Sequence, residues 1–394
     1  MQTKSNPLMN TFIRYTNQTI GVLALAVAAA AVAQETNSDA TLTPAGPSAT
    51  PLHWLSPTNG EVAVCGLPWF QENGGDLVRL PVRLKSTFRP PVWSLARSPS
   101  GARIRFRSDT KILSLRLEYP STPKMANMHA YGQTGVDLYA DGVYFSTAVA
   151  DLEAKPGKIY ERVLLDLPNA PRVEREITLY LPLYMPVKVR GIGLDPEAKV
   201  TPAKPFARAK PVVFYGTSIT QGGCASRPGL SYEAILGRQL NIDFVNLGFS
   251  GNGLGEPEMA SAVAEIDAAC FVLDFGANHK TGEAMRAVYA PFLDAVRARH
   301  PATPIVVMTP LYTAREERMP SLKLDWQQRR DYISQVVRQR IKAGDKQLFL
   351  VDGARLLGSN PGDGLVDGGH PNDLGFSRMA DGLAPVLGRA LQLR

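Results

Sequence analysis

The sequence predicts an α/β protein in which an all-β sandwich precedes a three-layer α/β domain with five parallel strands. Between residues 50 and 195, apolar side chains recur at every second position, which is typical of half-buried strands. From residue 212 onward, short apolar runs alternate with segments of helical periodicity, which predicts a parallel sheet covered on both faces. A length of 394 residues also suits two domains better than one.

The first 33 residues resemble an export signal. Lys4 and Arg14 precede an uncharged stretch, residues 20–33, which ends in Ala31-Val32-Ala33 and offers an A-x-A cleavage site. As a helix, this stretch would be about 21 Å long, short of the roughly 30 Å hydrocarbon core of a bilayer. We therefore expect cleavage after Ala33, a secreted or periplasmic mature protein, and no stable membrane insertion.

Residues 34–195 are expected to form the β-sandwich, which resembles a jelly roll. In residues 113–119 and 177–183, every second position holds Leu, Ile or Tyr, and residues 102–107 (ARIRFR) alternate as well. Asp141-Gly142 separates two strand-like runs and predicts a hairpin turn. This half of the chain shows no helical periodicity of useful length.

Residues 196–211 (PEAKVTPAKPFARAKP) are rich in Pro, Ala and Lys, which is typical of a linker. The expected α/β domain follows at 212–394. Its expected strands are 212–215, 242–247, 270–275, 304–308 and 347–351, and its expected helices are 231–240, 257–268, 283–300, 325–343 and 375–391.

Composition argues against several classes of function. The formal charge is +7, and removal of Lys4 and Arg14 leaves about +5 because residues 1–33 contain no acidic group. The basic residues are scattered or lie on the outer face of one expected helix, so we expect no nucleic-acid partner. The three cysteines, Cys65, Cys224 and Cys270, are too few for a disulfide framework or a zinc site, although a disulfide at Cys224 stays open. No metal or cofactor is expected, and the sequence does not indicate the oligomeric state.

Polar residues follow three of the expected strands. The first strand runs into Gly216-Thr217-Ser218, the second into NLGFSGNG (246–253), and the third into GANH (276–279). The carboxyl ends of parallel strands meet at one edge of a sheet, where ligands bind. Near the C-terminus, DGGH (367–370) precedes the last expected helix.

These residues supply the parts that acyl transfer needs. Ser218 offers a hydroxyl nucleophile, and His370 offers the base that must take its proton. Asp367, three residues before His370, can reach its Nδ1 and hold the tautomer. Gly251 and Asn278 can donate N–H groups to a developing oxyanion.

Residues 212–380 resemble the SGNH hydrolases, the GDSL-type esterase superfamily. GTSIT is similar to the first block of that family, NLGFSGNG to the second, GANH to the third and DGGH to the fifth. The resemblance implies a flavodoxin-like fold, a catalytic Ser218–His370–Asp367 group, and an oxyanion hole formed by Ser218, Gly251 and Asn278. In the third block, His279 stands where Asp is common. The string GVDLY (135–139) resembles the signature of a β-rich domain that precedes one group of these esterases.

Other interpretations compete at single positions. Ser218 alone could be a turn or capping residue. GTSITQGG lacks the Lys-Ser/Thr ending of a P-loop and, with Thr220 in place of the second Gly, does not match G-x-S-x-G. His279 competes with His370 as the base, and Gly248 with Gly251 as the donor.

Further residues have lesser roles in this interpretation. Asp373 is the expected cap of the last helix. Arg227 and His129 are candidate substrate-binding residues, and the loop that holds Asn127, His129 and Tyr131 could contribute to specificity. Arg227 could equally be an ordinary surface arginine.

We expect an exported serine esterase that acts through an acyl-enzyme and removes O-acetyl groups from a carbohydrate. The expected partner is therefore an acylated small molecule or polysaccharide. One alternative is a lipase-like hydrolase of lipid or thioester acyl chains. The other is a non-catalytic carbohydrate-binding protein, whose expected sign, loss of Ser218, His370 or Asp367, is absent from the sequence.

Overall fold

The chain forms two antiparallel β-sheets followed by one parallel sheet, in a computed structural model that describes residues 51–58, 60–150 and 155–393. The expected export signal and its cleavage site lie outside the described residues. Within the described ranges, no helix combines the length and the apolar character needed to cross a bilayer.

The N-terminal sheets form a sandwich, which we call the β domain (described residues 51–201). One sheet has the order β1(His53–Leu55), β9(Lys188–Leu194), β4(Ile112–Glu118), β7(Ile159–Asp166). The other has the order β10(Val200–Thr201), β3(Arg103–Ser108), β8(Arg175–Tyr180), β5(Val136–Ala140), β6(Val143–Ala148), and β2(Ala63–Cys65) also pairs with β3. Alternate side chains of both sheets share one hydrophobic cluster, as the period-two pattern predicts. The predicted Asp141-Gly142 turn joins β5 to β6, with φ of 50° and 79° at the two residues.

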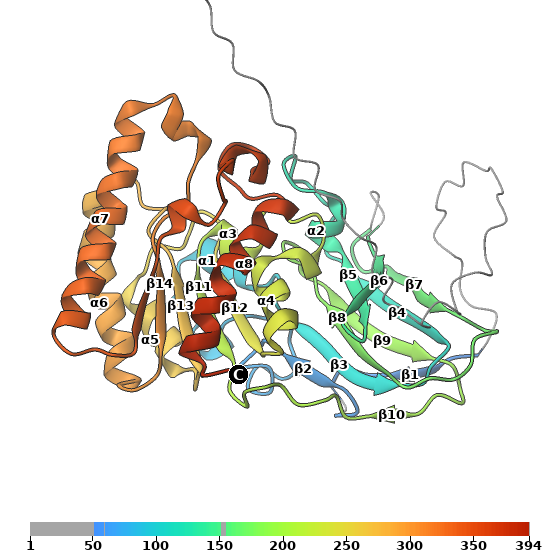
Figure 1. Cartoon of the computed structure of the whole chain (residues 1–394). Coiled ribbons are helices and arrows are strands. Elements are labelled where there is room, and N and C mark those ends of the chain that lie inside the picture. The colour runs from blue at the N-terminus through green and yellow to red at the C-terminus, as the bar shows by residue number, and fades with distance from the viewer. Residues whose placement is uncertain (1–50, 59, 151–154, 394) are drawn as a thin grey trace, which may run out of the picture. The chain divides into compact units, whose positions relative to one another are not determined.

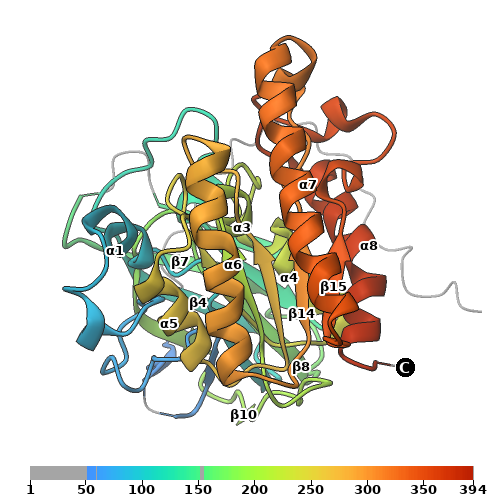
Figure 2. The same cartoon turned by 90° about the vertical axis from the view of Figure 1, so that its left-hand side faces the viewer.

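The second half, residues 212–393, is the α/β domain. Its parallel sheet has the order β12(Phe244–Gly248), β11(Val212–Gly216), β13(Cys270–Asp274), β14(Ile305–Met308), β15(Leu348–Val351). Helices α5(Pro257–Glu265), α6(Gly282–Arg299) and α7(Pro320–Lys342) cover one face (Figure 1) and face the viewer in Figure 2. Helices α4(Tyr232–Leu240) and α8(Asp373–Ala390) cover the other. All ten predicted elements are present, and the strand order reverses between β11 and β13, which marks the expected ligand edge.

Residues 67–97 depart from the period-two pattern of the β domain. This segment contains the short helix α1(Pro90–Ala96), which the sequence analysis did not predict. Trp69, Leu80 and Val92 belong to the same buried cluster as Val213 of β11. The hydrophobic core of the α/β domain is therefore completed by a segment that precedes it by more than a hundred residues.

A buried arginine ties this segment to the parallel sheet. Arg79 is 1% exposed and donates to the carbonyl oxygens of Ser98 (2.8 Å) and Leu95 (2.9 Å). It also donates to Asn246 O (3.0 Å) and Gly248 O (2.7 Å) in β12. Burial lowers the pKa of Arg79 to about 9. A desolvated guanidinium is tolerated here because carbonyl oxygens of both domains accept its N–H groups.

The expected linker is bound along the β domain. Val200 and Thr201 extend the second sheet as β10, paired with β3. Arg107 donates to Pro202 O (3.0 Å), and Arg105 donates to Lys204 O (3.1 Å). These contacts hold the connection in one conformation rather than leaving it as a free spacer.

Replacing Arg79 with Ala is expected to lower the free energy of unfolding by at least about 3 kcal/mol, because several buried carbonyl oxygens lose a charged donor. Urea denaturation followed by circular dichroism measures this. Arg83→Ala is the control on the same segment, since its side chain is 46% exposed and its ion pairs with Glu72 and with Glu265 of α5 lie at the surface. The control should change the free energy by about 1 kcal/mol or less. Equal effects would show that Arg79 is not a structural anchor.

Candidate active site

Ser218 lies at the point where β11 ends and the short helix α3(Ser218–Gln221) begins. Thr217 caps this helix by accepting a hydrogen bond from Ile219 N (3.3 Å). Gly216 makes the turn possible, because a Cβ there would lie 1.9 Å from Thr220 Oγ1. The apolar strand thus ends on a glycine and two hydroxyls because the chain turns tightly and presents Ser218 at the sheet edge.

The structure brings Ser218, His370 and Asp367 together. Ser218 Oγ lies 2.9 Å from His370 Nε2, and His370 Nδ1 lies 2.8 Å from Asp367 Oδ2. This chain can pass the serine proton to the imidazole while the carboxylate holds the ring in orientation. Of the two candidate bases, only His370 contacts Ser218.

Asp367 accepts four hydrogen bonds. Its Oδ1 receives the backbone N–H groups of Gly369 (3.0 Å) and His370 (2.9 Å). Its Oδ2 receives the His370 ring and the side-chain amide of Asn127 (3.0 Å), which comes from the β domain. Partial burial opposes ionisation, but the donors from Asn127 and His370 hold the pKa of Asp367 well below its usual range. Asp367 is therefore a carboxylate at neutral pH.

The candidate oxyanion donors differ in whether their N–H groups already have acceptors. Asn278 Oδ1 accepts from Gly253 N (3.1 Å), which leaves the amide NH2 of Asn278 to line the cavity described below. Within the described residues, the N–H groups of Gly251 and of Ser218, the first residue of α3, have no recorded acceptor. The N–H of Gly248, in contrast, is donated to Asn246 Oδ1 (2.9 Å). The Gly248 N–H is therefore already engaged, which argues against Gly248 as an oxyanion donor and leaves Gly251 as the candidate.

A cavity of about 200 Å³ opens beside the serine and the histidine. Its lining combines apolar and aromatic side chains with the serine, the histidine, two threonines, an asparagine and one arginine, and consists of Thr217, Ser218, Ile219, Ala277, Asn278, Leu311, Tyr312, Thr313, Arg315, Leu322, Trp326, Gly369 and His370. Trp326 on α7 is fixed by donating its Nε1–H to Leu311 O (3.2 Å). The pocket is thus built from strand ends together with residues 311–326.

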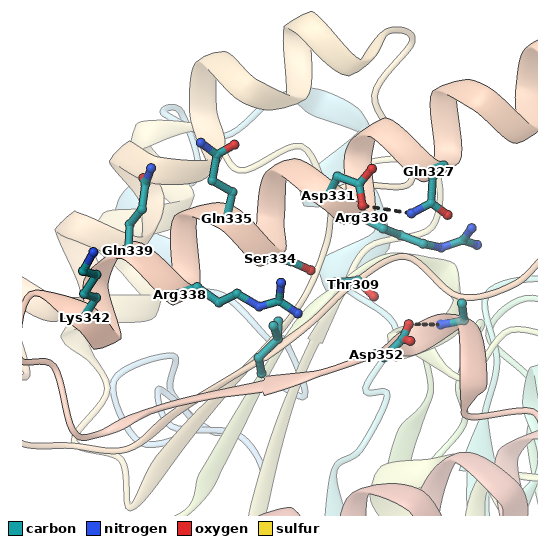
Figure 3. A pocket seen from close by; sticks show the side chains of 12 residues that line it. Thr309, Gln327, Arg330, Asp331, Ser334, Gln335, Arg338, Gln339, Lys342 and Asp352 are labelled. Carbon is teal, nitrogen blue, oxygen red and sulfur yellow. Dashed lines mark hydrogen bonds between the residues drawn. The ribbon is translucent and has the colours of Figure 1, made fainter.

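A larger groove of about 570 Å³ runs along α7 beside β15 (Figure 3). Gln327, Asp331, Ser334 and Arg338 project into it from the helix. Gln327 is bonded to Asp331 (2.9 Å), and this groove holds no histidine or cysteine next to a hydroxyl nucleophile. Its chemistry is that of a polar surface groove, so the smaller cavity is the candidate active site.

The structure places the two candidate substrate-binding residues outside the cavity lining. Arg227 donates to Asp137 Oδ2 (3.1 Å) and to Tyr139 OH (2.7 Å), in the GVDLY strand. Its guanidinium also lies 3.7 Å from the ring centroid of Tyr144. His129 caps the short helix α2(Ala130–Thr134) by accepting from Tyr131 N (3.3 Å). Arg227 therefore joins the two domains, and the recorded bond of His129 is local.

Two further expectations need correction or refinement. The cap of α8 is Asn372, which accepts from Gly375 N (3.0 Å), and Asp373 instead binds Ser226 N (2.8 Å). His279 is buried and its Nε2 lies 3.0 Å from Leu254 O. Burial lowers the pKa of His279 and favours its neutral form. The histidine in the third block thus contacts the loop between β12 and α5.

The three cysteines are free thiols. Ligand atoms of Cys224, Asp367 and His370 lie within 4.8 Å of one another, which is compatible in distance with a metal site. Burial raises the pKa of the Cys224 thiol to about 12, and Asp367 and His370 are already bonded to each other. These features fit a catalytic pair beside a protonated thiol better than a set of metal ligands.

Sequence reasoning missed two residues that support the serine. Tyr184 of the β domain donates its hydroxyl to Ser218 O (3.2 Å). Asp274, at the end of β13, accepts from Thr220 Oγ1 (2.9 Å) and Tyr232 OH (3.3 Å) below the α3 turn. No local motif marks either residue, because each contact depends on the tertiary fold.

Asp274 makes stability depend on pH. Burial raises its pKa to about 7, although Thr220 and Tyr232 donate hydrogen bonds to it. An unfolded Asp has a pKa of about 3.9, so between pH 4 and 7 the folded state holds a proton that the unfolded state has lost. Stability supplied by this group is therefore complete below pH 4 and lost as the pH rises through 7.

At pH 8, Asp274→Asn is expected to be more stable than the wild type. The difference in free energy of unfolding between the variant and the wild type should be larger at pH 8 than at pH 4.5, by on the order of 2–4 kcal/mol. Thermal or urea unfolding at the two pH values measures this. Asp267→Asn, at a carboxylate with a 73% exposed side chain, is the control and should show no such trend. A stability difference that does not change with pH would contradict the assignment of Asp274 as a buried, protonated acid.

Comparison with known proteins identifies the family of both halves of the chain. Residues 209–388 match the GDSL-like lipase/acylhydrolase family, and residues 52–200 match the N-terminal domain of SGNH hydrolase-type esterases. A protein described as a GDSL-like lipase from Bacteroides ovatus is 31% identical, with a TM-score of 0.76 over 87% of this chain and 99% of that one. No curated protein matches the chain.

More distant structures share the fold. A salicylyl-acyltransferase from a tetracycline biosynthetic pathway is 23% identical, with a TM-score of 0.72 over 87% of this chain and 98% of its own. A family two carbohydrate esterase from Cellvibrio japonicus is 13% identical, with a TM-score of 0.58 over the same shares of the two chains. The family matches and the Bacteroides structure together show that this chain belongs to the GDSL-like lipase/acylhydrolase family and is a carboxylic ester hydrolase with an SGNH-type N-terminal domain.

Proposed function

We propose that the protein is an exported serine esterase that removes short acyl groups, acetyl above all, from a carbohydrate. The observation that carries the proposal is the bonded chain from Ser218 Oγ through His370 to Asp367, next to a cavity of about 200 Å³. A pocket of this volume is smaller than the roughly 300–1,000 Å³ typical of drug-sized ligands.

In the proposed reaction, His370 Nε2 takes the proton of Ser218 as Oγ attacks the ester carbonyl carbon. The tetrahedral oxyanion is stabilised by the N–H groups of Ser218 and Gly251 and by the Asn278 amide. The imidazolium then gives its proton to the departing alcohol, which leaves an acyl-serine. Water attacks this ester by the same route, and the acid and free serine are released.

Two features support a short acyl group on a larger alcohol. Ile219, Leu311 and Trp326 give the cavity apolar walls suited to a small acyl group, whereas a long chain would exceed its volume. The β domain lies against the catalytic loops through Asn127, so a bulky alcohol portion could contact both domains. A carbohydrate is the substrate class we propose for that portion, by analogy with other exported esterases that carry a β-sandwich. A lipase-like specificity is the alternative.

Ser218→Ala is expected to abolish hydrolysis of p-nitrophenyl acetate, because the variant has no oxygen to form the acyl-enzyme. Asn278→Ala should retain activity but lose roughly 10²–10³ in kcat, the usual scale for one oxyanion donor. Ser261→Ala, at an exposed serine on α5, controls for surface serines. Circular dichroism should show a native fold in all three variants. Wild-type rates in Ser218→Ala would refute the proposed nucleophile.

The acyl pocket can be tested with p-nitrophenyl esters of two, four, eight and sixteen carbons. We expect kcat/KM to fall at least about tenfold between the butyrate and the octanoate, because the additional methylenes do not fit. Trp326→Ala should reduce this difference by enlarging the cavity, while Leu324→Ala, 60% exposed on the same helix, should not. A rate that rises with chain length in the wild type would favour the lipase alternative.

A further inference from the structure

The carboxylate of Asp367 has one donor that does not belong to its own loop. Three of its four hydrogen bonds come from Gly369 N and from the backbone and ring of His370. The fourth comes from Asn127 Nδ2, at 3.0 Å, and joins residues 240 positions apart in the sequence. Both this amide and the histidine ring bind the same oxygen, Oδ2.

The loop that carries Asn127 is held by a buried glutamine. Gln133 is 3% exposed, and its Oε1 accepts the backbone N–H groups of Lys124 (2.9 Å) and Met125 (3.0 Å). Its Nε2 donates to the carbonyl oxygens of Met125 (3.1 Å) and Met128 (2.6 Å). Asn127 lies between these fixed points, so little conformational freedom has to be lost when it binds Asp367.

The same loop is docked on the α/β domain. The Met128 side chain is buried in the cluster that contains Phe376 of α8 and Leu357. Gly132 approaches Ala225 so closely that a Cβ would lie 2.2 Å from the Ala225 carbonyl oxygen. Packing of the segment that directly follows Asn127 therefore helps to set its distance from Asp367.

An amide side chain at position 127 is well suited to orienting the carboxylate of Asp367. The Asp367 side chain is 28% exposed, so without Asn127 water could compete for Oδ2 and the carboxylate could rotate. A neutral N–H donor fixes the plane of the carboxylate without neutralising its charge, whereas a Lys or Arg would compete with the imidazolium for it. A displaced base can lower the rate about 10²-fold, so a change in the orientation of His370 toward Ser218 should be measurable as a fall in kcat.

From this geometry we propose that Asn127 is a positioning residue: the β domain completes the catalytic group of the α/β domain by fixing Asp367 against His370. The inference rests on the proposed function of Ser218 and goes beyond it, because it gives the N-terminal domain a part in the chemistry. The loop's role would then be orientation of the triad, in addition to any contact with substrate.

Asn127→Ala is expected to lower kcat for p-nitrophenyl acetate about 10- to 100-fold while KM stays within about twofold. Melting temperature and the native circular dichroism spectrum are measured on the same samples, so that kcat refers to folded protein. Lys124→Ala, at an exposed side chain in the same loop, is the matched control and should keep wild-type kinetics. The small ester has no bulky alcohol portion, so a loss on it reports on chemistry rather than on recognition.

Asn127→Asp keeps the shape but replaces the donor with a second carboxylate. This variant should lose at least as much kcat, and the acid limb of its kcat/KM profile should move to higher pH because the added charge favours the protonated ring of His370. The Cys224 thiol near Asp367 does not titrate in this range, because burial raises its pKa to about 12.

The outcomes separate this inference from the proposed function. Loss of activity in Ser218→Ala together with wild-type kcat in Asn127→Ala would overturn only the role of Asn127. A fall in folded fraction with unchanged kcat per folded molecule would overturn it as well, because the residue would then be structural. An inactive wild type, or an active Ser218→Ala, would overturn both proposals.

Discussion

The burial of one guanidinium constrains both halves of this protein. Arg79 is removed from water, and its N–H groups reach acceptors in its own segment, Ser98 O and Leu95 O, and in β12, Asn246 O and Gly248 O. Removing the Arg79 side chain from the packed structure would leave several buried carbonyl oxygens without a charged donor, at a cost of several kcal/mol. The described residues accordingly lie within one compact unit.

The hydrogen bonds of Arg79 also fix backbone at the edge of the parallel sheet where the candidate site lies. Arg79 holds the end of β12, from which the loop containing Gly251 departs. Asp137 of the GVDLY string accepts from Gly229 N (2.8 Å) and from Arg227 in the segment after α3. Asn127 contacts Asp367 itself, so the β domain binds β12, the segment after α3 and one member of the candidate catalytic group. In this account the N-terminal domain is a structural part of the active site rather than an appended module.

The sequence predicted the fold where local pattern reflects burial. The strands of the parallel sheet are buried on both faces and appear as short apolar runs, and the two antiparallel sheets show alternation because each has one inward face. Ser218, His370 and Asp367 could be named because each lies in a recognisable string at the end of a strand or before a helix. Segment 67–97 could not be assigned, since its packing on the parallel sheet leaves no regular period.

The remaining differences between the sequence predictions and the structure come from contacts between residues that are distant in the sequence. Arg227 follows the nucleophile loop and looked suited to a cleft, but its partner Asp137 lies 90 positions away. Asn127 was grouped with a loop that could contribute to specificity, and the structure shows that its side chain contacts Asp367. Asp274 and Tyr184 have no local signal at all, because only the folded sheet brings them below Ser218. Pairings of this kind require the three-dimensional structure.

The central claim is that Ser218 is the activated nucleophile of this site. The most direct test is to treat the wild-type protein with a fluorophosphonate, which reacts with activated serines, and to locate the adduct by peptide mass spectrometry. The account predicts one stoichiometric adduct on Ser218 and none on the Ser218→Ala protein. An adduct on a different residue, or an unmodified Ser218 in a protein that hydrolyses esters, would contradict it.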